Sequence, residues 1–204
     1  MKKILCFDDS NTYGFIPGIG GRYPQNVRWT GFLQELYHQE IDIIEAGCNN
    51  RTGFMPNPEG EKQTGYKALP RELNGDFDLI ILSIGINDLQ TQYNVSMPVL
   101  RQGLEGLIET CRKNCPQAQI LIMAPPHLRP NVLNCLFSCM FDKNSIEKSK
   151  KLAALYEQVA QEKHCEFLNL EGIAEVSAID GLHYTAKGHN SVAKAVFNKI
   201  QMRT

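Results

Sequence analysis

The stretch KILCFDDSNTYG, residues 3–14, decides how the rest of the chain is interpreted. Its apolar run at residues 4–7 has the length of a buried parallel strand and stops abruptly at small polar residues. In open α/β sheets, functional sites form beyond the carboxyl ends of such strands. Ser10 is therefore placed where a nucleophile could act. Asp9, Ser10 and Thr12 are also common turn and cap residues, so the stretch alone leaves a structural role open.

Composition limits the class of protein. With 204 residues, the chain is expected to fold as one domain over residues 1–204. A net charge of −1 gives no field that would recruit nucleic acid or an anionic membrane. No apolar stretch approaches the ~20 residues that a membrane span needs. The seven scattered cysteines are an odd number, which favours reduced thiols and a cytoplasmic location.

Apolar and helical segments alternate along the chain. After the strand at residues 4–7, strands are predicted at residues 41–46, 77–84, 119–124 and 165–170. Helices are predicted at about 29–38, 65–73, 98–114, 145–163 and 186–202. This alternation predicts a flavodoxin-like α/β fold, in which a five-stranded parallel sheet lies between two layers of helices.

Polar loops follow four of the predicted strands, and their carboxyl ends should meet at one crevice. These loops carry Ser10, Gly47, Asn87, and Asp180 with His183. Histidine can take a proton from serine if an acceptor on its other ring nitrogen fixes the tautomer, and Asp180 is close enough in sequence to be that acceptor. The N–H groups of Ser10 and Gly47 and the Asn87 amide are candidate donors to an oxyanion. The set contains what acyl transfer needs.

These residues fall in four blocks that occur in a familiar order. The blocks are FDDS at residues 7–10, the loop at Gly47, GIND at residues 85–88 and DGLH at residues 180–183. Together they resemble the SGNH hydrolase superfamily, also called GDSL esterases and lipases. The blocks span residues 7–183, which is nearly the whole chain, and four blocks in one order are a far more specific signal than any one of them.

Two further segments narrow the resemblance. NVRWTG at residues 26–31, and IEAG at residues 44–47 followed by Arg51-Thr52, are similar to the arylesterase-like branch of that superfamily.

The resemblance assigns roles to the residues of the four blocks. It implies Ser10 as nucleophile, His183 as base, Asp180 as the residue that orients the base, and Ser10, Gly47 and Asn87 as the oxyanion hole. It implies a three-layer α/β/α fold and no metal or organic cofactor. Relatives in the arylesterase-like branch often form homo-oligomers, which suggests the same for this chain.

The first block departs from the family pattern. The usual Gly-Asp-Ser-Leu reads Asp8-Asp9-Ser10-Asn11 here. A carboxylate aimed at the oxyanion would oppose its charge. We therefore expect the side chain of Asp8 to point away from the site, toward Arg51 or a backbone N–H.

Residues near the loops are candidates for contact with substrate. Trp29, Arg51 and His127 are the predicted substrate-binding side chains. The loop residues Leu136, Phe137, Met140 and Phe141 fit a core, a wall of the acyl pocket, or a subunit contact.

Other histidines and cysteines have simpler explanations. His189 falls in the last predicted helix and is expected to be a packed or surface histidine. Cys111 with Cys115, and Cys135 with Cys139, have spacings that a zinc site could use, but small buried side chains explain the first pair.

The predicted function is a serine esterase that acts on small, short-acyl esters. A carbohydrate O-acetylesterase is the alternative within the enzyme class, and a catalytically weak relative that serves as a binding module is the alternative outside it. A flavodoxin-like nucleotide binder is disfavoured, because no phosphate-cradling glycine loop follows the first strand. The expected partner is a small ester, without nucleic acid or membrane.

Overall fold

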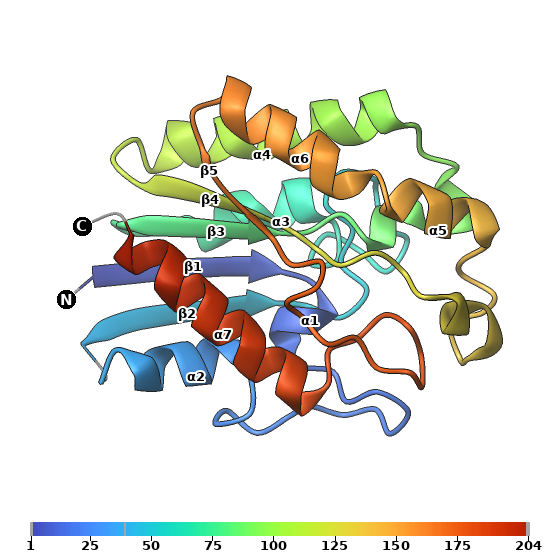
Figure 1. Cartoon of the computed structure of the whole chain (residues 1–204). Helices are drawn as coiled ribbons and strands as arrows, with labels where there is room; N and C mark the ends of the chain where they lie inside the picture. The colour runs from blue at the N-terminus through green and yellow to red at the C-terminus, as the bar shows by residue number, and fades with distance from the viewer. Residues whose placement is uncertain (1, 39, 203–204) are drawn as a thin grey trace.

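The computed structural model describes residues 2–38 and 40–202. Its strands are β1 (Lys2–Asp8), β2 (Ile41–Gly47), β3 (Leu79–Ser83), β4 (Gln119–Ala124) and β5 (Glu166–Asn169). They form one five-stranded sheet in the order β2-β1-β3-β4-β5, and every neighbouring pair is parallel (Figure 1). The predicted parallel α/β fold is confirmed.

Strict alternation along the inner strands builds one hydrophobic core on each face of the sheet. In β1, Ile4 and Cys6 belong to one core, whereas Leu5 and Phe7 belong to the other. The helices α2 (Trp29–Leu36) and α7 (Ala186–Gln201) cover the first face. The second face is covered by α3 (Gly65–Glu72), α4 (Met97–Asn114) and α6 (Leu152–Glu162). Successive side chains of a strand point to opposite faces, so an unbroken apolar run fills both cores.

Short helices gather near the carboxyl ends of the strands. They are α1 (Ser10–Tyr13), η1 (Asn87–Leu89), η2 (Thr91–Tyr93), η3 (Pro130–Asn134) and α5 (Lys143–Ser149). In Figure 1, α1 and α5 lie at the end of the sheet toward which the strands point. No helix in residues 2–38 or 40–202 is long and apolar enough to cross a membrane.

The single helix predicted at residues 145–163 is wrong, because the structure has two helices, α5 and α6. The hydroxyl of Ser145 donates to the carbonyl of Leu89, and the hydroxyl of Ser149 accepts from the N–H of Leu128. These bonds hold α5 against loops at the carboxyl end, whereas α6 packs on β4 and β5. One straight helix could not pack against both the loops and the sheet, so the helix is interrupted between α5 and α6.

Candidate active site

The turn that carries Ser10 is the capped start of a short helix. The side chain of Asp9 accepts from the N–H of Asn11 at 2.9 Å, and α1 ends at Gly14, whose φ of 86° is left-handed. Ser10 is the first helical residue, so its N–H has no acceptor within α1, and none elsewhere in the described chain. Asp9 is thus a cap residue, and the cap leaves the N–H of Ser10 available.

Ser10, His183 and Asp180 form a continuous chain of contacts. Nε2 of His183 lies 2.9 Å from Oγ of Ser10, and Nδ1 lies 2.9 Å from Oδ2 of Asp180. All three residues are at most 5% exposed. The structure therefore brings together side chains that are 173 residues apart in the sequence.

The Asp180 carboxylate is held ready to orient the imidazole. Oδ1 accepts from the N–H groups of Leu182 and His183 at 3.0 Å each. Burial opposes ionisation of Asp180, but the bonds from His183 and from these N–H groups keep its pKa below the usual value. An ionised Asp180 is an acceptor only, so Nδ1 of His183 carries the proton and Nε2 is free to accept one from Ser10.

A further bond ties the His183 loop to the Ser10 turn. Oδ1 of Asn11 accepts from the N–H of Tyr184 at 3.0 Å. Asn11 replaces the apolar residue usual in the family block, and this bond gives the replacement a structural purpose. The ring of His183 also packs against Phe15 at 4.4 Å and Phe137 at 5.3 Å between ring centroids. The imidazole of His183 is therefore fixed by its backbone, its carboxylate partner and the neighbouring rings.

Asn87 lies beside Ser10 with its amide oriented by neighbours. Nδ2 donates to the carbonyl of Arg51 at 3.1 Å and makes a longer contact of 3.4 Å with Oδ2 of Asp9. Oδ1 accepts from Nε2 of Gln90 at 3.3 Å. The donor end of Asn87 therefore faces the Ser10 turn. Gln90 was not singled out from the sequence, although it follows Asn87 by one helical turn.

The structure does not place Gly47 in the cavity wall. A Cβ at this position would lie 2.1 Å from the backbone N of Tyr13, so glycine is required where α1 packs on β2. The loop that follows brings Asn49 and Asn50 to the cavity instead. Asn50 has a φ of 57°, and its N–H has no acceptor in the described chain. The predicted loop therefore does reach the cavity, through Asn49 and Asn50, while Gly47 packs against α1.

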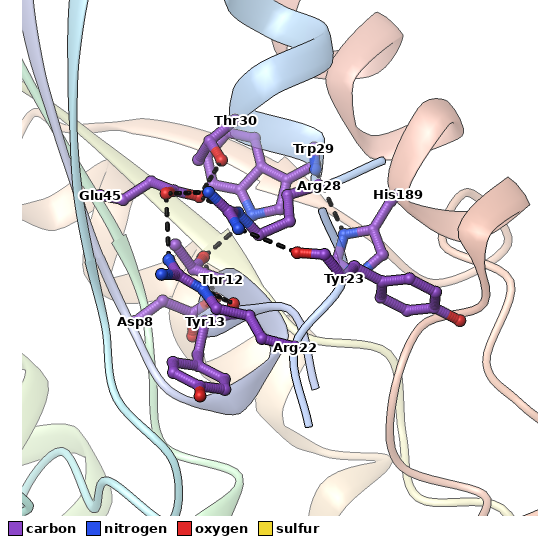
Figure 2. Close-up of polar contacts among 10 residues, drawn as sticks. All are labelled: Asp8, Thr12, Tyr13, Arg22, Tyr23, Arg28, Trp29, Thr30, Glu45 and His189. Atoms are coloured by element: carbon purple, nitrogen blue, oxygen red, sulfur yellow. Dashed lines mark hydrogen bonds and ion pairs between the residues drawn. The ribbon is translucent and has the colours of Figure 1, made fainter. Parts of the chain in front are cut away.

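Trp29 is not a substrate-binding residue, which corrects the sequence prediction. It is 1% exposed, and its Nε1 donates to Oγ1 of Thr12 at 2.9 Å. Its backbone N–H donates to Nδ1 of His189 at 3.3 Å, as Figure 2 shows. His189 is completely buried, which confirms that it is a packed histidine. An indole on a helix that covers the sheet belongs to the core behind the Ser10 turn.

The two segments that resemble the arylesterase-like branch pack against each other. Arg28 pairs with Glu45 through two bonds, of 2.8 and 2.9 Å, and the hydroxyl of Thr30 also donates to Glu45 (Figure 2). Gly31 lies so close to the chain that a Cβ there would be 1.9 Å from the carbonyl oxygen of Gln25. In this chain, the two segments are therefore joined to each other by an ion pair and hydrogen bonds.

Arg51 is likewise buried, at 1% exposure, and does not reach the cavity. Its guanidinium donates to the carbonyls of Asp8, Ala46 and Lys62 and lies 4.5 Å over the ring of Phe7. The prediction that it binds substrate is wrong, because the side chain is buried and is directed at these backbone carbonyls, away from the cavity. It joins the ends of β1 and β2 to the loop between β2 and α3.

His127 lies apart from the cavity and corrects the third predicted contact. Its Nδ1 is 2.9 Å from Glu171, and Glu171 also pairs with Arg129 at 2.8 Å. These side chains are partly exposed and do not line the cavity beside Ser10. His127 follows β4 at the expected end of the sheet, but its side chain contacts Glu171 in the loop after β5.

Asp8 points away from the reacting groups, as expected. Its Oδ1 accepts from the N–H of Asp9 at 2.7 Å, and its Oδ2 accepts from the hydroxyl of Thr12 at 2.6 Å (Figure 2). The partners are thus a backbone N–H and a hydroxyl, whereas Arg51 bonds the Asp8 carbonyl. The hydroxyl of Thr12 accepts from Nε1 of Trp29 and donates its own proton to Asp8.

Buried carboxylates surround the Ser10 turn. Burial, then the neighbouring Asp9 charge, raises the pKa of Asp8 well above its usual value, and burial raises the pKa of Asp9 to about 6. Burial also raises the pKa of Asp88 to about 7, although three backbone N–H groups at residues 53–55 donate to it. Asp88 therefore anchors the loop after β2, which supports the structural role predicted for it.

The cavity beside Ser10 has a volume of about 200 Å³. Its apolar lining is Phe15, Phe137, Met140, Phe141 and Leu182, and its polar lining outside Ser10 and His183 is Asn49, Asn50, Glu59 and Asn87. Of the loop residues at 136–141 named from the sequence, Phe137, Met140 and Phe141 form a wall of the pocket, which was one of the predicted possibilities. The fourth, Leu136, is 84% exposed. Asn50 and Glu59 were missed, because neither follows a strand directly in a family motif.

No cluster of three or more His, Cys, Asp or Glu side chains that could hold a metal ion occurs in the described ranges. All seven cysteines are free thiols. Burial raises the pKa of Cys111 to about 12, as for a packed apolar thiol.

Solved structures with the same architecture include esterases. A carbohydrate acetylesterase from Sinorhizobium meliloti is 28% identical, with a TM-score of 0.93 over 100% of both chains. The inhibitor-bound aryl esterase of M. smegmatis is 25% identical, with a TM-score of 0.91 over 99% of both chains. A search of curated protein sequences found no significant match.

A sequence model of the GDSL-like lipase/acylhydrolase family matches residues 6–190. This match covers the Ser10 turn, the Asn87 loop and the loop that carries Asp180 and His183. The chain is therefore a member of the GDSL-like lipase/acylhydrolase family, with the fold of the SGNH hydrolases.

Proposed function

We propose that the protein is a serine esterase that hydrolyses small, short-acyl carboxylic esters through an acyl-enzyme. The observation that carries the proposal is the chain from Asp180 through His183 to Ser10, joined by two contacts of 2.9 Å at a cavity wall. The volume of about 200 Å³ supports a small substrate, since pockets for drug-sized ligands begin at roughly 300 Å³. The proposal rests on the whole described chain acting as one catalytic domain.

Acylation begins when Oγ of Ser10 attacks the ester carbonyl while Nε2 of His183 takes its proton. The bond between Oγ and carbon forms, and the bond between carbon and the alcohol oxygen then breaks. The leaving alcohol receives the proton from His183, and the acyl group remains on Ser10. Water repeats the sequence on the acyl-enzyme and releases the acid. Asp180 stays ionised and stabilises the imidazolium at each step.

The oxyanion would be bound by donors that have no strong partner in the free protein. The N–H of Ser10 and the N–H of Asn50 have no acceptor in the described chain. The 3.4 Å contact between Asn87 and Asp9 is long, so this N–H can turn to the oxyanion as charge develops. These three groups make the proposed oxyanion hole, with Asn50 in the place expected for Gly47.

The second candidate function is hydrolysis of acetyl esters of carbohydrates. The polar wall of Asn49, Asn50 and Glu59 favours it, because amides and a carboxylate can bond the hydroxyl groups of a sugar. A 28%-identical relative is described as a carbohydrate acetylesterase. A panel of aryl acetates and acetylated sugars, compared by kcat/KM, separates the two candidates.

Ser10→Ala tests the proposal in either form. We expect the variant to keep its circular dichroism spectrum and melting temperature and to lose about 10⁴-fold or more in kcat/KM. Activity within tenfold of wild type would contradict Ser10 as the nucleophile. Absence of hydrolysis by the folded wild type on the whole panel would favour a binding module.

Cellular context extends the proposal. Seven free thiols support a reducing, cytoplasmic compartment. The resemblance to the arylesterase-like branch supports a homo-oligomer, which sedimentation analysis would test.

A further inference from the structure

One wall of the cavity beside Ser10 carries an isolated negative charge. Among the described residues that line the cavity, Glu59 is the single carboxylate, and none is a lysine or arginine. Glu59 is solvent-exposed, so it lies at the mouth of the cavity. The remaining polar wall consists of neutral amides, and Phe15, Phe137 and Phe141 supply aromatic surface.

Hydrogen bonds fix Glu59 from both ends. Its backbone N–H donates to Oδ1 of Asn57 at 2.9 Å, and its Oε1 accepts from Nδ2 of Asn50 at 2.5 Å. Asn57 is buried and bonds the Asn50 carbonyl, while Oδ1 of Asn50 accepts from Gln90 at 2.7 Å. Glu59 is therefore attached to the same amide network that reaches Asn87, unlike a surface glutamate that moves freely.

The charge of Glu59 is not neutralised by a neighbour. The nearby Glu61 pairs with Lys67 at 3.9 Å and with Arg71. Glu59 has no ion pair with a lysine, arginine or histidine of the described chain. An unpaired carboxylate at the mouth of a partly apolar cleft attracts cations and repels anions over several ångströms. Aromatic faces add favourable contacts for an ammonium group.

We propose that Glu59 sets the charge selectivity of the esterase, favouring esters whose alcohol part is positively charged and disfavouring anionic ones. This inference rests on the proposed function, because it concerns the alcohol that leaves Ser10. It goes beyond that function by naming a specificity-determining residue and the charge of the substrate. Asn50 holds the carboxylate in place, and the oxygen of Glu59 that Asn50 does not bond remains for the substrate.

Three matched substrates test the charge preference. They are phenyl acetates that carry a trimethylammonium, a tert-butyl or a sulfonate group at the same ring position. We expect Glu59→Gln, which keeps an acceptor for Asn50, to lower kcat/KM about three- to tenfold for the cation and raise it similarly for the anion. The kcat/KM of the neutral ester in the same variant is the reference to which both changes are compared. Glu61→Gln removes a charge from the same loop outside the cavity. It should leave the cation-to-neutral and anion-to-neutral ratios of kcat/KM unchanged.

Salt provides a second measurement that needs no variant. In wild type, the preference for the cationic over the neutral ester should decrease from 0.02 M to 0.5 M NaCl, since salt screens exposed charges. Equal changes for all three esters in Glu59→Gln, or a preference that salt leaves unaltered, would overturn the proposal. If wild type does not hydrolyse the neutral ester, the esterase assignment itself fails, and the two failures are thereby distinguished.

Discussion

In the described chain, two histidine–carboxylate pairs lie near the carboxyl end of the sheet, and one of them contacts a serine. His183 and Asp180 are 2.9 Å apart, as are His127 and Glu171. The first pair is buried, with both side chains 3% exposed, whereas the second is 27% and 36% exposed. Nε2 of His183 reaches Ser10, while His127 has Arg129 beside it.

The difference shows that two pairs with the same contact distance can lie in very different environments. An exposed ion pair contributes little, because water screens the charges and competes for the donors. Burial strengthens the interaction of Asp180 with the imidazolium formed when Ser10 loses its proton. His127, by contrast, lies beside Arg129. The two pairs therefore differ in burial and in the group beside the histidine, which is Ser10 for His183 and Arg129 for His127.

Removing the carboxylate of each pair should therefore have very different consequences. Asp180→Asn should lower kcat/KM for a neutral aryl ester by about 10⁴, because the amide no longer holds His183 in the required tautomer. Glu171→Gln makes the same chemical change in the exposed pair and should alter kcat/KM less than about twofold. Losses of equal size would contradict the assignment of Asp180.

Asn87→Ala tests the donor side of the buried centre. It should lower kcat by roughly 10²–10³ and change KM much less, because an oxyanion donor acts mainly on the transition state. Full saturation curves on one aryl ester give both constants. A change confined to KM would show that Asn87 binds the substrate and does not stabilise the oxyanion.

His189 extends the comparison to a buried histidine without a carboxylate. Burial, with Arg28 and His183 nearby, lowers its pKa to about 4, whereas an unfolded histidine titrates near 6.5. The contribution of neutral His189 to the free energy of unfolding is therefore fully present above pH ~6.5. As the pH decreases from there through ~4, the free energy of unfolding falls by about 3 kcal/mol. Urea unfolding of wild type and His189→Gln between pH 7 and pH 4 measures this difference. A constant difference across that range would refute the role of His189.

Asp8→Gly restores the residue usual in the family and should have the smallest effect on rate. Its carboxylate bonds Asp9 and Thr12, so kcat/KM should change less than about tenfold. Stability should fall by about 1–3 kcal/mol, because a buried N–H and a hydroxyl lose their acceptor. A hundredfold gain in kcat/KM would instead show that Asp8 suppresses catalysis.

The fold, and the convergence of Ser10, Asn87 and the DGLH segment, could be predicted because they depend on local pattern, topology and motif order. Alternating burial along β1 follows directly from its apolar run, and parallel strands bring their carboxyl ends to one edge. Ser10 and Asn87 lie directly after β1 and shortly after β3. Asp180 and His183 lie farther along the loop between β5 and α7, and the resemblance of the four blocks to a known family placed them in the site.

The substrate wall could not be predicted in this way. Glu59 reaches the cavity through a turn at Asn57 and a left-handed residue, Asn50, within a long loop. Trp29 and Arg51 were misassigned because an indole and a guanidinium suit either a ligand or buried acceptors. Their acceptors, Thr12 and backbone carbonyls, become neighbours only after folding. The chemistry of a side chain does not show whether it binds a ligand or a buried acceptor unless its position in the fold is known.

Labelling with a fluorophosphonate tests the central claim most directly, because the reagent requires a serine activated by a neighbouring base. Intact-mass and peptide mass spectrometry should find one adduct per chain, on Ser10, in wild type and in Glu171→Gln. Asp180→Asn should react far more slowly, and Ser10→Ala should not react. An unlabelled wild type, or an adduct on any residue other than Ser10, would contradict the buried chain from Asp180 through His183 to Ser10 as the catalytic centre.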